Sequence, residues 1–243
     1  MKHLLLAMAL GAAAFATDAS AQAAKPTVVL VHGAFADASS WNGVIRILEK
    51  DGYPVVAVAN PLRGVASDGA YVGDVVASLG KPVVLVGHSY GGSVITEAAR
   101  DKSNVKALVY VAAFAPDVGE TAAGLSGKFP GSTLGPAIAP PVKLATGGND
   151  LYIQQDRFHQ QFAADVSKAD AALMAATQRP ITEAALNEKS GSPSWTTIPS
   201  WFVYGDKDLN IPPKALAFMA ERAKSRNTEV VAGASHVVMV SHP

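Results

Sequence analysis

Six short runs of apolar, mostly β-branched residues are separated by stretches that have the periodicity of helices. The runs occupy residues 27–31, 54–58, 82–86, 105–111, 200–204 and 228–231. They do not alternate apolar with polar side chains, which is typical of strands that helices cover on both faces. Strands that alternate with helices form a parallel sheet with right-handed crossovers. We therefore expect one α/β domain with a mostly parallel sheet of about six strands and helices on both faces.

The composition agrees with one large core and a neutral surface. The chain has 243 residues, of which 49% are hydrophobic and 16% are charged, so a single core of ordinary size can form. Twenty lysines and arginines balance twenty aspartates and glutamates, and we therefore expect no nucleic-acid partner. The absence of cysteine excludes a thiolate nucleophile and a thiolate metal site.

The pentapeptide Gly87-His88-Ser89-Tyr90-Gly91 stands between the third apolar run and a helical stretch. In this strand-to-helix context, a G-x-S-x-G serine occupies a tight turn that leaves its hydroxyl above the edge of the sheet. Glycines on both sides let the backbone close up without Cβ clashes. Ligands of such sheets bind outside the carboxyl ends of the strands, so we expect Ser89 to be a nucleophile.

A serine hydroxyl is weakly nucleophilic at neutral pH and needs a histidine base that a carboxylate orients. The histidine should come last along the chain, after the acid. His236 lies in the loop after the last apolar run, and we expect it to be the base. His242 lies beside the terminus and fits this role less well.

Three aspartates are candidates for the orienting acid. Asp208 and Asp206 follow the fifth apolar run, and Asp117 follows the fourth. We favour Asp208, because Asp206 stands in the turn directly after its strand, where aspartate commonly bonds its own backbone.

An attacked carbonyl also needs two hydrogen-bond donors for its oxyanion. The backbone N–H of Ala34 follows the first apolar run, and the N–H of Tyr90 follows Ser89. We expect this pair to form the oxyanion hole. His32 and His88 are interpreted as structural residues that brace the two loops.

The strand-helix alternation stops over about residues 113–195. Phe158 and Phe162 have helical spacing, and residues 171–177 and 181–187 also look helical. Because so long an insertion with helices of its own is uncommon as a loop, we expect a small helical cap over the site.

The N-terminus has the pattern of a secretory signal. Met1-Lys2-His3 precedes a short apolar stretch, and Ala19-Ser20-Ala21 supplies a small-x-small cleavage site. The sequence therefore predicts a signal peptide over 1–21, a mature domain over 22–243, and a secreted or periplasmic protein without a stable membrane anchor.

With these residues in place, the chain from Pro26 onward resembles the α/β-hydrolase fold family. The matching positions are His32-Gly33, Trp41, Ser89, Asp208 and His236. The small cap and the His32-Gly33-Ala34 opening are similar to the group of plant methyl-ester esterases and hydroxynitrile lyases. Members of the family usually continue with a further helix after the histidine loop, whereas this sequence ends at Pro243.

Two positions separate the relatives within this group. The lyases that the chain resembles carry threonine at the position of Gly33 and lysine at the position of Val237, and both marks are missing. Dehalogenases and epoxide hydrolases of this fold use aspartate at the position of Ser89. The resemblance thus implies a serine hydrolase that cleaves small carboxylic esters through an acyl-enzyme, with no metal or organic cofactor. A lactonase, a C–C bond hydrolase or a lyase-like enzyme on the same triad is the alternative, and a silent small-ligand binder is a further one.

Overall fold

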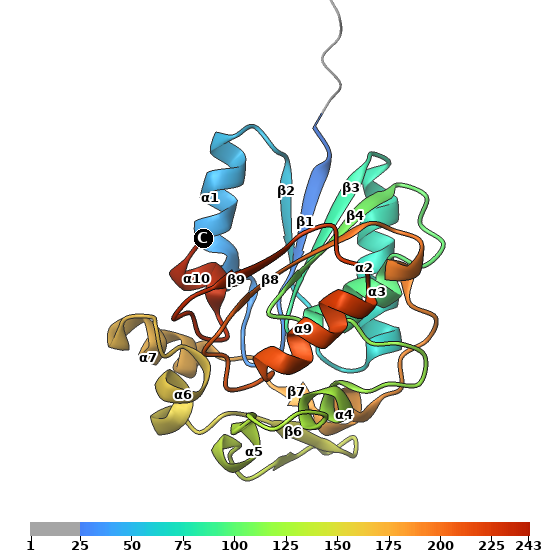
Figure 1. Cartoon of the computed structure of the whole chain (residues 1–243). Coiled ribbons are helices and arrows are strands. Elements are labelled where there is room, and N and C mark those ends of the chain that lie inside the picture. Colours follow the sequence, from blue (N-terminus) through green and yellow to red (C-terminus); the bar gives the residue numbers. More distant parts are fainter. Residues whose placement is uncertain (1–24) are drawn as a thin grey trace, which may run out of the picture.

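The computed structural model describes residues 25–243, so the expected signal peptide lies outside the described residues. Six strands form one sheet in the order β2-β1-β3-β4-β8-β9, and every neighbouring pair is parallel (Figure 1). The strands are β1 (Thr27–Val31), β2 (Val55–Val58), β3 (Val83–His88), β4 (Val105–Val111), β8 (Ser200–Gly205) and β9 (Thr228–Val231). The predicted parallel α/β sheet is confirmed. The strand order reverses between β1 and β3, which is where such sheets bind ligands.

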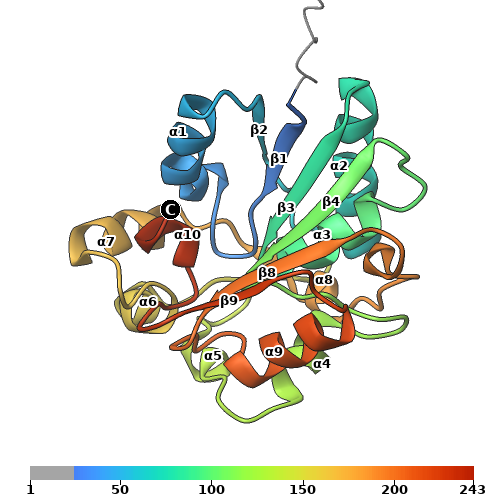
Figure 2. The same cartoon turned by 45° about the horizontal axis from the view of Figure 1, so that its top comes forward.

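Helices cover the sheet from two sides (Figures 1 and 2). On one side α1 (Asn42–Lys50) contacts α10 (Val238–Ser241), and on the other α2 (Val65–Leu79) packs on α3 (Tyr90–Ala98). The last long helix, α9 (Pro213–Arg222), packs on β8. None of the helices in the described residues is both long and apolar enough to cross a membrane.

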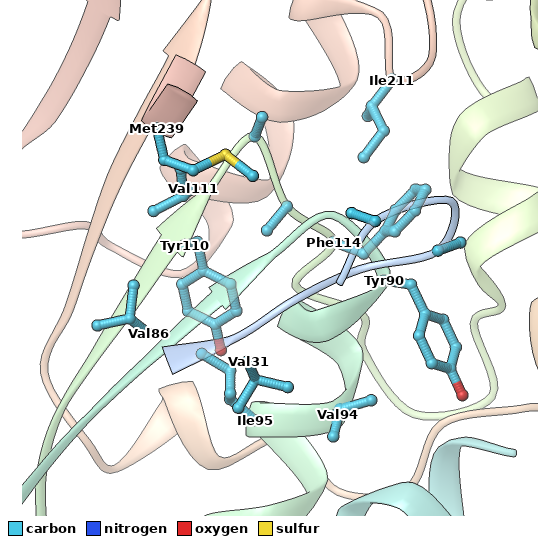
Figure 3. Close-up of a cluster of buried hydrophobic side chains, with 14 of the residues drawn as sticks. Val31, Val86, Tyr90, Val94, Ile95, Tyr110, Val111, Phe114, Ile211 and Met239 are labelled. Carbon is cyan, nitrogen blue, oxygen red and sulfur yellow. The ribbon is translucent and has the colours of Figure 1, made fainter. Parts of the chain in front are cut away.

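The core lies around the central strands, and the edge strand is open. All five residues of β1 are buried, whereas Val230 in β9 is 47% exposed. The side chains of Thr228, Glu229 and Val230 in β9 are exposed. The predicted cover on both faces therefore holds for the centre of the sheet and not for this edge. In the core beside α3, the Tyr110 ring stacks on Phe202 with centroids 4.6 Å apart. Figure 3 shows Tyr110 among Val86, Val111 and Ile95.

Between β4 and β8 the chain forms a cap that gathers beyond the carboxyl ends of the strands (Figure 1). Its helices are α4 (Ala122–Gly127), α5 (Leu134–Ala137), α6 (Gln155–Phe162), α7 (Lys168–Thr177) and α8 (Glu183–Asn187). A small antiparallel sheet of β5 (Val142–Lys143), β6 (Asn149–Leu151) and β7 (Ile181–Thr182) joins them. The helix expected over 181–187 therefore begins at Glu183, because the first two residues form β7. Strands of two or three residues are too short to show a periodicity in the sequence.

Candidate active site

Ser89 occupies a strained turn between β3 and α3. Its backbone has φ 54° and ψ −123°, a conformation that costs about 1–3 kcal/mol for a residue with a Cβ atom. Three backbone hydrogen bonds hold this turn. The N–H of Ser89 donates to Val111 O (3.2 Å), and its carbonyl accepts from Gly92 (2.9 Å) and Phe114 (3.1 Å). The strain therefore persists because buried backbone on both sides fixes the residue.

We call this turn, residues 87–91, the elbow. Two glycines let the elbow touch the loop that follows β1. A Cβ atom on Gly91 would collide with the carbonyl oxygen of Val31. One on Gly33 would lie 2.6 Å from Ser89 Cβ and 3.2 Å from the backbone nitrogen of Tyr90. The two loops that carry the predicted oxyanion donors are thus in direct contact, and Ala34 and Tyr90 line the same cavity as Ser89.

The cap holds the loop after β1 in place. The N–H of Phe35 donates to Arg179 O in the cap (2.9 Å). The Phe35 ring meets Phe162 edge to face, with centroids 6.2 Å apart. Phe35 also has a positive φ of 61°, so this neighbour of Ala34 is fixed in an unusual conformation by contacts from the cap.

His236 and Asp208 form a buried pair. His236 Nδ1 lies 2.7 Å from Asp208 Oδ2, and both side chains are at most 1% exposed. The other carboxylate oxygen accepts the backbone N–H groups of Asn210 (2.8 Å) and Ile211 (2.9 Å). Because Asp208 accepts the proton of Nδ1, the second ring nitrogen, Nε2, is left as the one that can take up a proton. This is the tautomer that a histidine base requires.

The competing candidates lie elsewhere. Asp206 is exposed and accepts the N–H of Gly233 (2.7 Å), so it joins the loops after β8 and β9 instead of bonding its own turn. Asp117 accepts the N–H of Val118 (2.7 Å). His242 is half exposed and lies 3.7 Å from Asp165. Of the predicted acids and histidines, the structure brings Asp208 and His236 together.

His88 packs behind this pair. Its Nε2–H donates to the backbone carbonyl of His236 (3.1 Å), and the centroids of the two imidazole rings lie 4.7 Å apart. Burial, followed by the neighbouring His236, holds the pKa of His88 well below its usual value. The neutral ring thus anchors the loop that carries His236, which fits the structural role expected of His88.

His32 braces the opposite loop. Its Nε2 accepts the N–H of Asn60 (3.0 Å), and its Nδ1–H donates to Gly33 O (2.9 Å). The side-chain amide of Asn60 returns a bond to the carbonyl of His32 (2.9 Å). Burial lowers the pKa of His32 to about 4. A proton on Nε2 would face the N–H of Asn60, so the bracing works only with a neutral ring.

The buried carboxylate of Asp68 is a site residue that the sequence does not reveal. It accepts the phenol hydroxyl of Tyr90 (3.0 Å) and the backbone N–H of Arg63 (3.0 Å). Burial raises the pKa of Asp68, and these hydrogen bonds oppose that rise. Arg63 in turn reaches Asp150 in the cap at 2.6 Å. An acid in the first turn of a helix is ordinary, so no sequence signal marks Asp68.

One cavity of about 310 Å³ joins these parts. Its floor holds Ser89, His236, Ala34 and Tyr90. Its walls are mostly apolar side chains of the cap and the neighbouring loops: Phe114, Leu134, Ile138, Leu151, Phe162, Leu186 and Ile211. Figure 3 draws Tyr90, Phe114 and Ile211 on the right of the buried cluster and Val86 on its left.

The lining carries almost no charge. None of the described residues that line the cavity has a carboxylate, an ammonium or a guanidinium group. In residues 25–243 no group of three histidine, aspartate or glutamate side chains is arranged to hold a metal ion. The cavity therefore suits a neutral, largely apolar molecule, to which it offers Ser89 and His236.

Comparison with known proteins places this arrangement in a family. The model described as "Alpha/beta hydrolase family" matches residues 28–243. The rice (Oryza sativa subsp. japonica) protein Esterase PIR7B is 25% identical over 90% of this chain and 92% of its own length. The Alpha-hydroxynitrile lyase of Arabidopsis thaliana is also 25% identical, over 90% and 93%. The crystal structure of polyneuridine aldehyde esterase has the same fold, with a TM-score of 0.76 and 20% identity over 90% of this chain and 95% of that one.

Proposed function

The chain belongs to the alpha/beta hydrolase family, and on that premise we propose that it hydrolyses small carboxylic esters through an acyl-enzyme on Ser89. The observation that carries the proposal is the buried His236–Asp208 pair at 2.7 Å, whose histidine lines one charge-free cavity together with the strained Ser89. A binding protein has no need for a strained serine, a tautomer-fixed histidine and a buried carboxylate in one place.

In the proposed reaction Ser89 Oγ attacks the ester carbonyl while His236 Nε2 takes its proton. The N–H groups of Ala34 and Tyr90 hold the oxyanion, each donor contributing about 10²- to 10³-fold in rate. His236 then returns the proton to the departing alcohol. Water, activated by the same histidine, releases the acid, and Asp208 keeps the ring oriented throughout.

The loop at Gly33 favours hydrolysis over cyanohydrin cleavage. A Cβ atom there would lie 2.6 Å from Ser89 Cβ and 2.7 Å from His88 O, so the threonine of the lyases does not fit this backbone. At the lysine position of those lyases, Val237 is fully buried. A lactonase or a C–C bond hydrolase would use the same serine and histidine, and the products from a panel of esters, lactones and β-diketones separate these reactions.

The place of action is part of the proposal. The signal pattern over 1–21 supports an enzyme that works outside the cytoplasm. Mass measurement of the mature N-terminus after expression of the full chain tests it: cleavage after Ala21 supports export, and an intact Met1 contradicts it.

The proposed chemistry is tested by comparing wild type with Ser89→Ala on p-nitrophenyl butyrate. We expect kcat/KM to fall by about 10⁴-fold or more, because no attacking group remains. Ser93→Ala is the matched control, since Ser93 lies one turn further along α3 and its buried Oγ has no hydrogen-bond partner in the described structure. Retained hydrolysis in Ser89→Ala would overturn the proposal.

A further inference from the structure

We infer that the cavity contains a polar subsite at the Asn210 side-chain amide, and that the preferred ester is a neutral molecule carrying a second acceptor oxygen of the keto or ether type. The identity of the scissile group rests on the proposed ester hydrolysis. The subsite itself rests on the surroundings of Asn210, which lines the same cavity as Ser89.

The other polar atoms of Asn210 are already engaged. Its backbone N–H donates to Asp208 Oδ1 (2.8 Å), and its backbone carbonyl accepts the hydroxyl of Ser126 (2.9 Å). Its side-chain Oδ1 accepts the amide of Gln161 at 2.8 Å. Only the NH₂ group of the side chain has no partner in the described part of the protein, although the residue is 3% exposed.

The orientation of this amide is fixed by a second residue. The Gln161 amide nitrogen also donates to Leu209 O (3.0 Å), and its oxygen accepts the hydroxyl of Thr133 (2.8 Å). Gln161 must therefore present its NH₂ group to Asn210, which must answer with its oxygen. The NH₂ group of Asn210 is thus left as a donor that the protein holds in place and does not use.

A buried donor without a partner costs about 1–3 kcal/mol, and a ligand acceptor removes that cost. Asn210 shares its side of the cavity with two hydroxyl groups, since Ser126 Oγ lies 2.9 Å from Asn210 O and 3.5 Å from Ser132 Oγ. Apart from Ser89, Tyr90 and His236 on the floor, the remaining lining is apolar. Together they describe a small polar patch in an apolar cavity.

The partner of this patch must be neutral. A carboxylate or phosphate would lose its hydration in a cavity whose described lining offers no cation. A keto or ether oxygen accepts one hydrogen bond and loses much less. We therefore expect the preferred substrate to differ from a plain alkyl ester by one additional keto or ether oxygen.

The test uses matched esters that differ in that oxygen alone. Methyl octanoate is compared with its 3-, 4- and 5-oxo derivatives, and butyl hexanoate with 2-methoxyethyl hexanoate. Together the two series search the acyl and the alcohol sides of the cavity. For each pair the readout is the ratio of kcat/KM for the oxygen-bearing ester to that for the alkyl ester, in wild type and in Asn210→Leu.

We expect the ratio to fall about three- to tenfold in Asn210→Leu for the pair whose oxygen reaches the amide. The ratio is used because a shift of the Asp208 loop would lower both rates together. Asn210→Asp keeps the size and the acceptor for Gln161 but loses the donor, so it should lower the ratio at least as far. Asn227→Leu, at an exposed position, should leave every ratio unchanged.

Binding to the Ser89→Ala protein separates this inference from the proposed chemistry. Dissociation constants for the same esters, with and without Asn210→Leu, are measured by calorimetry without turnover. If the oxygen-bearing ester binds more tightly only when Asn210 is present, the subsite stands, even where no ester is hydrolysed and the proposed function fails. Ratios that Asn210→Leu leaves unchanged for every pair, in turnover and in binding, would mean that the amide meets only water, and would overturn the inference.

Discussion

The residues at the floor of the cavity and those of its walls are held by different kinds of contact. The floor residues Ser89 and His236, and Asp208 buried behind His236, are fixed by hydrogen bonds to buried backbone or to one another. The walls from the cap are apolar side chains such as Leu134 and Leu186, carried by helices of four and five residues. Hydrogen bonds impose distance and direction, whereas apolar contacts impose only shape and volume. The chemistry should therefore depend on the floor, and the choice among substrates on the walls.

The apolar side chains of the walls make no hydrogen bonds, and the polar contacts between the cap and the rest of the chain come from other residues. The N–H of Phe35 bonds Arg179 O, and Arg63 links Asp68 beneath the elbow to Asp150 in the cap. A change in the floor should consequently affect all esters alike. A change in a wall should alter the ratio between esters.

The largest effect is expected from the buried acid. Asp208→Asn should lower kcat about 10⁴-fold, because the amide no longer holds His236 in the tautomer with a free Nε2. Steady-state kinetics on p-nitrophenyl butyrate measures it. Asp206→Asn is the matched control and should stay within about twofold of wild type, since Asp206 bonds Gly233 and not the histidine. A large loss in Asp206→Asn with none in Asp208→Asn would reverse the assignment.

A smaller effect concerns the free energy of unfolding of the protein at low pH. Burial lowers the pKa of His32 to about 4, whereas a histidine in the unfolded chain titrates near 6.5. Between these values the unfolded state binds more protons, so the free energy of unfolding decreases as the pH falls from 7 to 4. The share of His32 is roughly 3 kcal/mol.

Urea unfolding at pH 7, 6 and 5 in wild type and in His32→Gln measures the part of this share that falls in that range, about 2 kcal/mol. His88, with its lowered pKa, acts in the same direction and remains in the variant, so the difference between the two slopes is the readout. Parallel slopes would show that His32 is not held neutral by burial.

The next effect tests the link beneath the elbow. Asp68→Asn should reduce the free energy of unfolding by about 2 kcal/mol, because one amide group faces N–H donors that the carboxylate accepted. Tyr90→Phe, which removes only one donor to the same carboxylate, should cost about 1 kcal/mol. Asp74→Asn, on the exposed face of α2, is the control. Equal stability of Asp68→Asn and wild type would exclude the link.

The smallest effect belongs to the walls. Leu134→Ala should lower the kcat/KM ratio of p-nitrophenyl hexanoate to acetate about five- to tenfold, because lost apolar contact weakens the longer chain more. Leu173→Ala, also in the cap but 66% exposed, should leave the ratio unchanged. If Leu134→Ala instead lowered both rates equally, the cap would contribute to the chemistry and not to selection.

The same contrast explains what the sequence reveals. The positions of Ser89, Asp208 and His236 follow from strand ends in a parallel sheet, because each stands in a loop directly after a recognisable apolar run. The three short strands of the cap have no such pattern, and the residues of β7 continue the helical pattern of α8 in the sequence. Asp68 and Asn210 look like an ordinary helix acid and a turn residue. Their roles depend on burial and on partners far away in the sequence, which only the folded chain supplies.

In the proposed mechanism Ser89 is a nucleophile that His236 activates. A fluorophosphonate reports on it directly, because it reacts covalently with an activated serine and the modified residue is identified by peptide mass spectrometry. We expect one label per chain, on Ser89, with loss of esterase activity in step with labelling and a much slower reaction in His236→Gln. An enzyme that loses no activity while Ser89 stays unlabelled, or that carries the inactivating label on another residue, would contradict it.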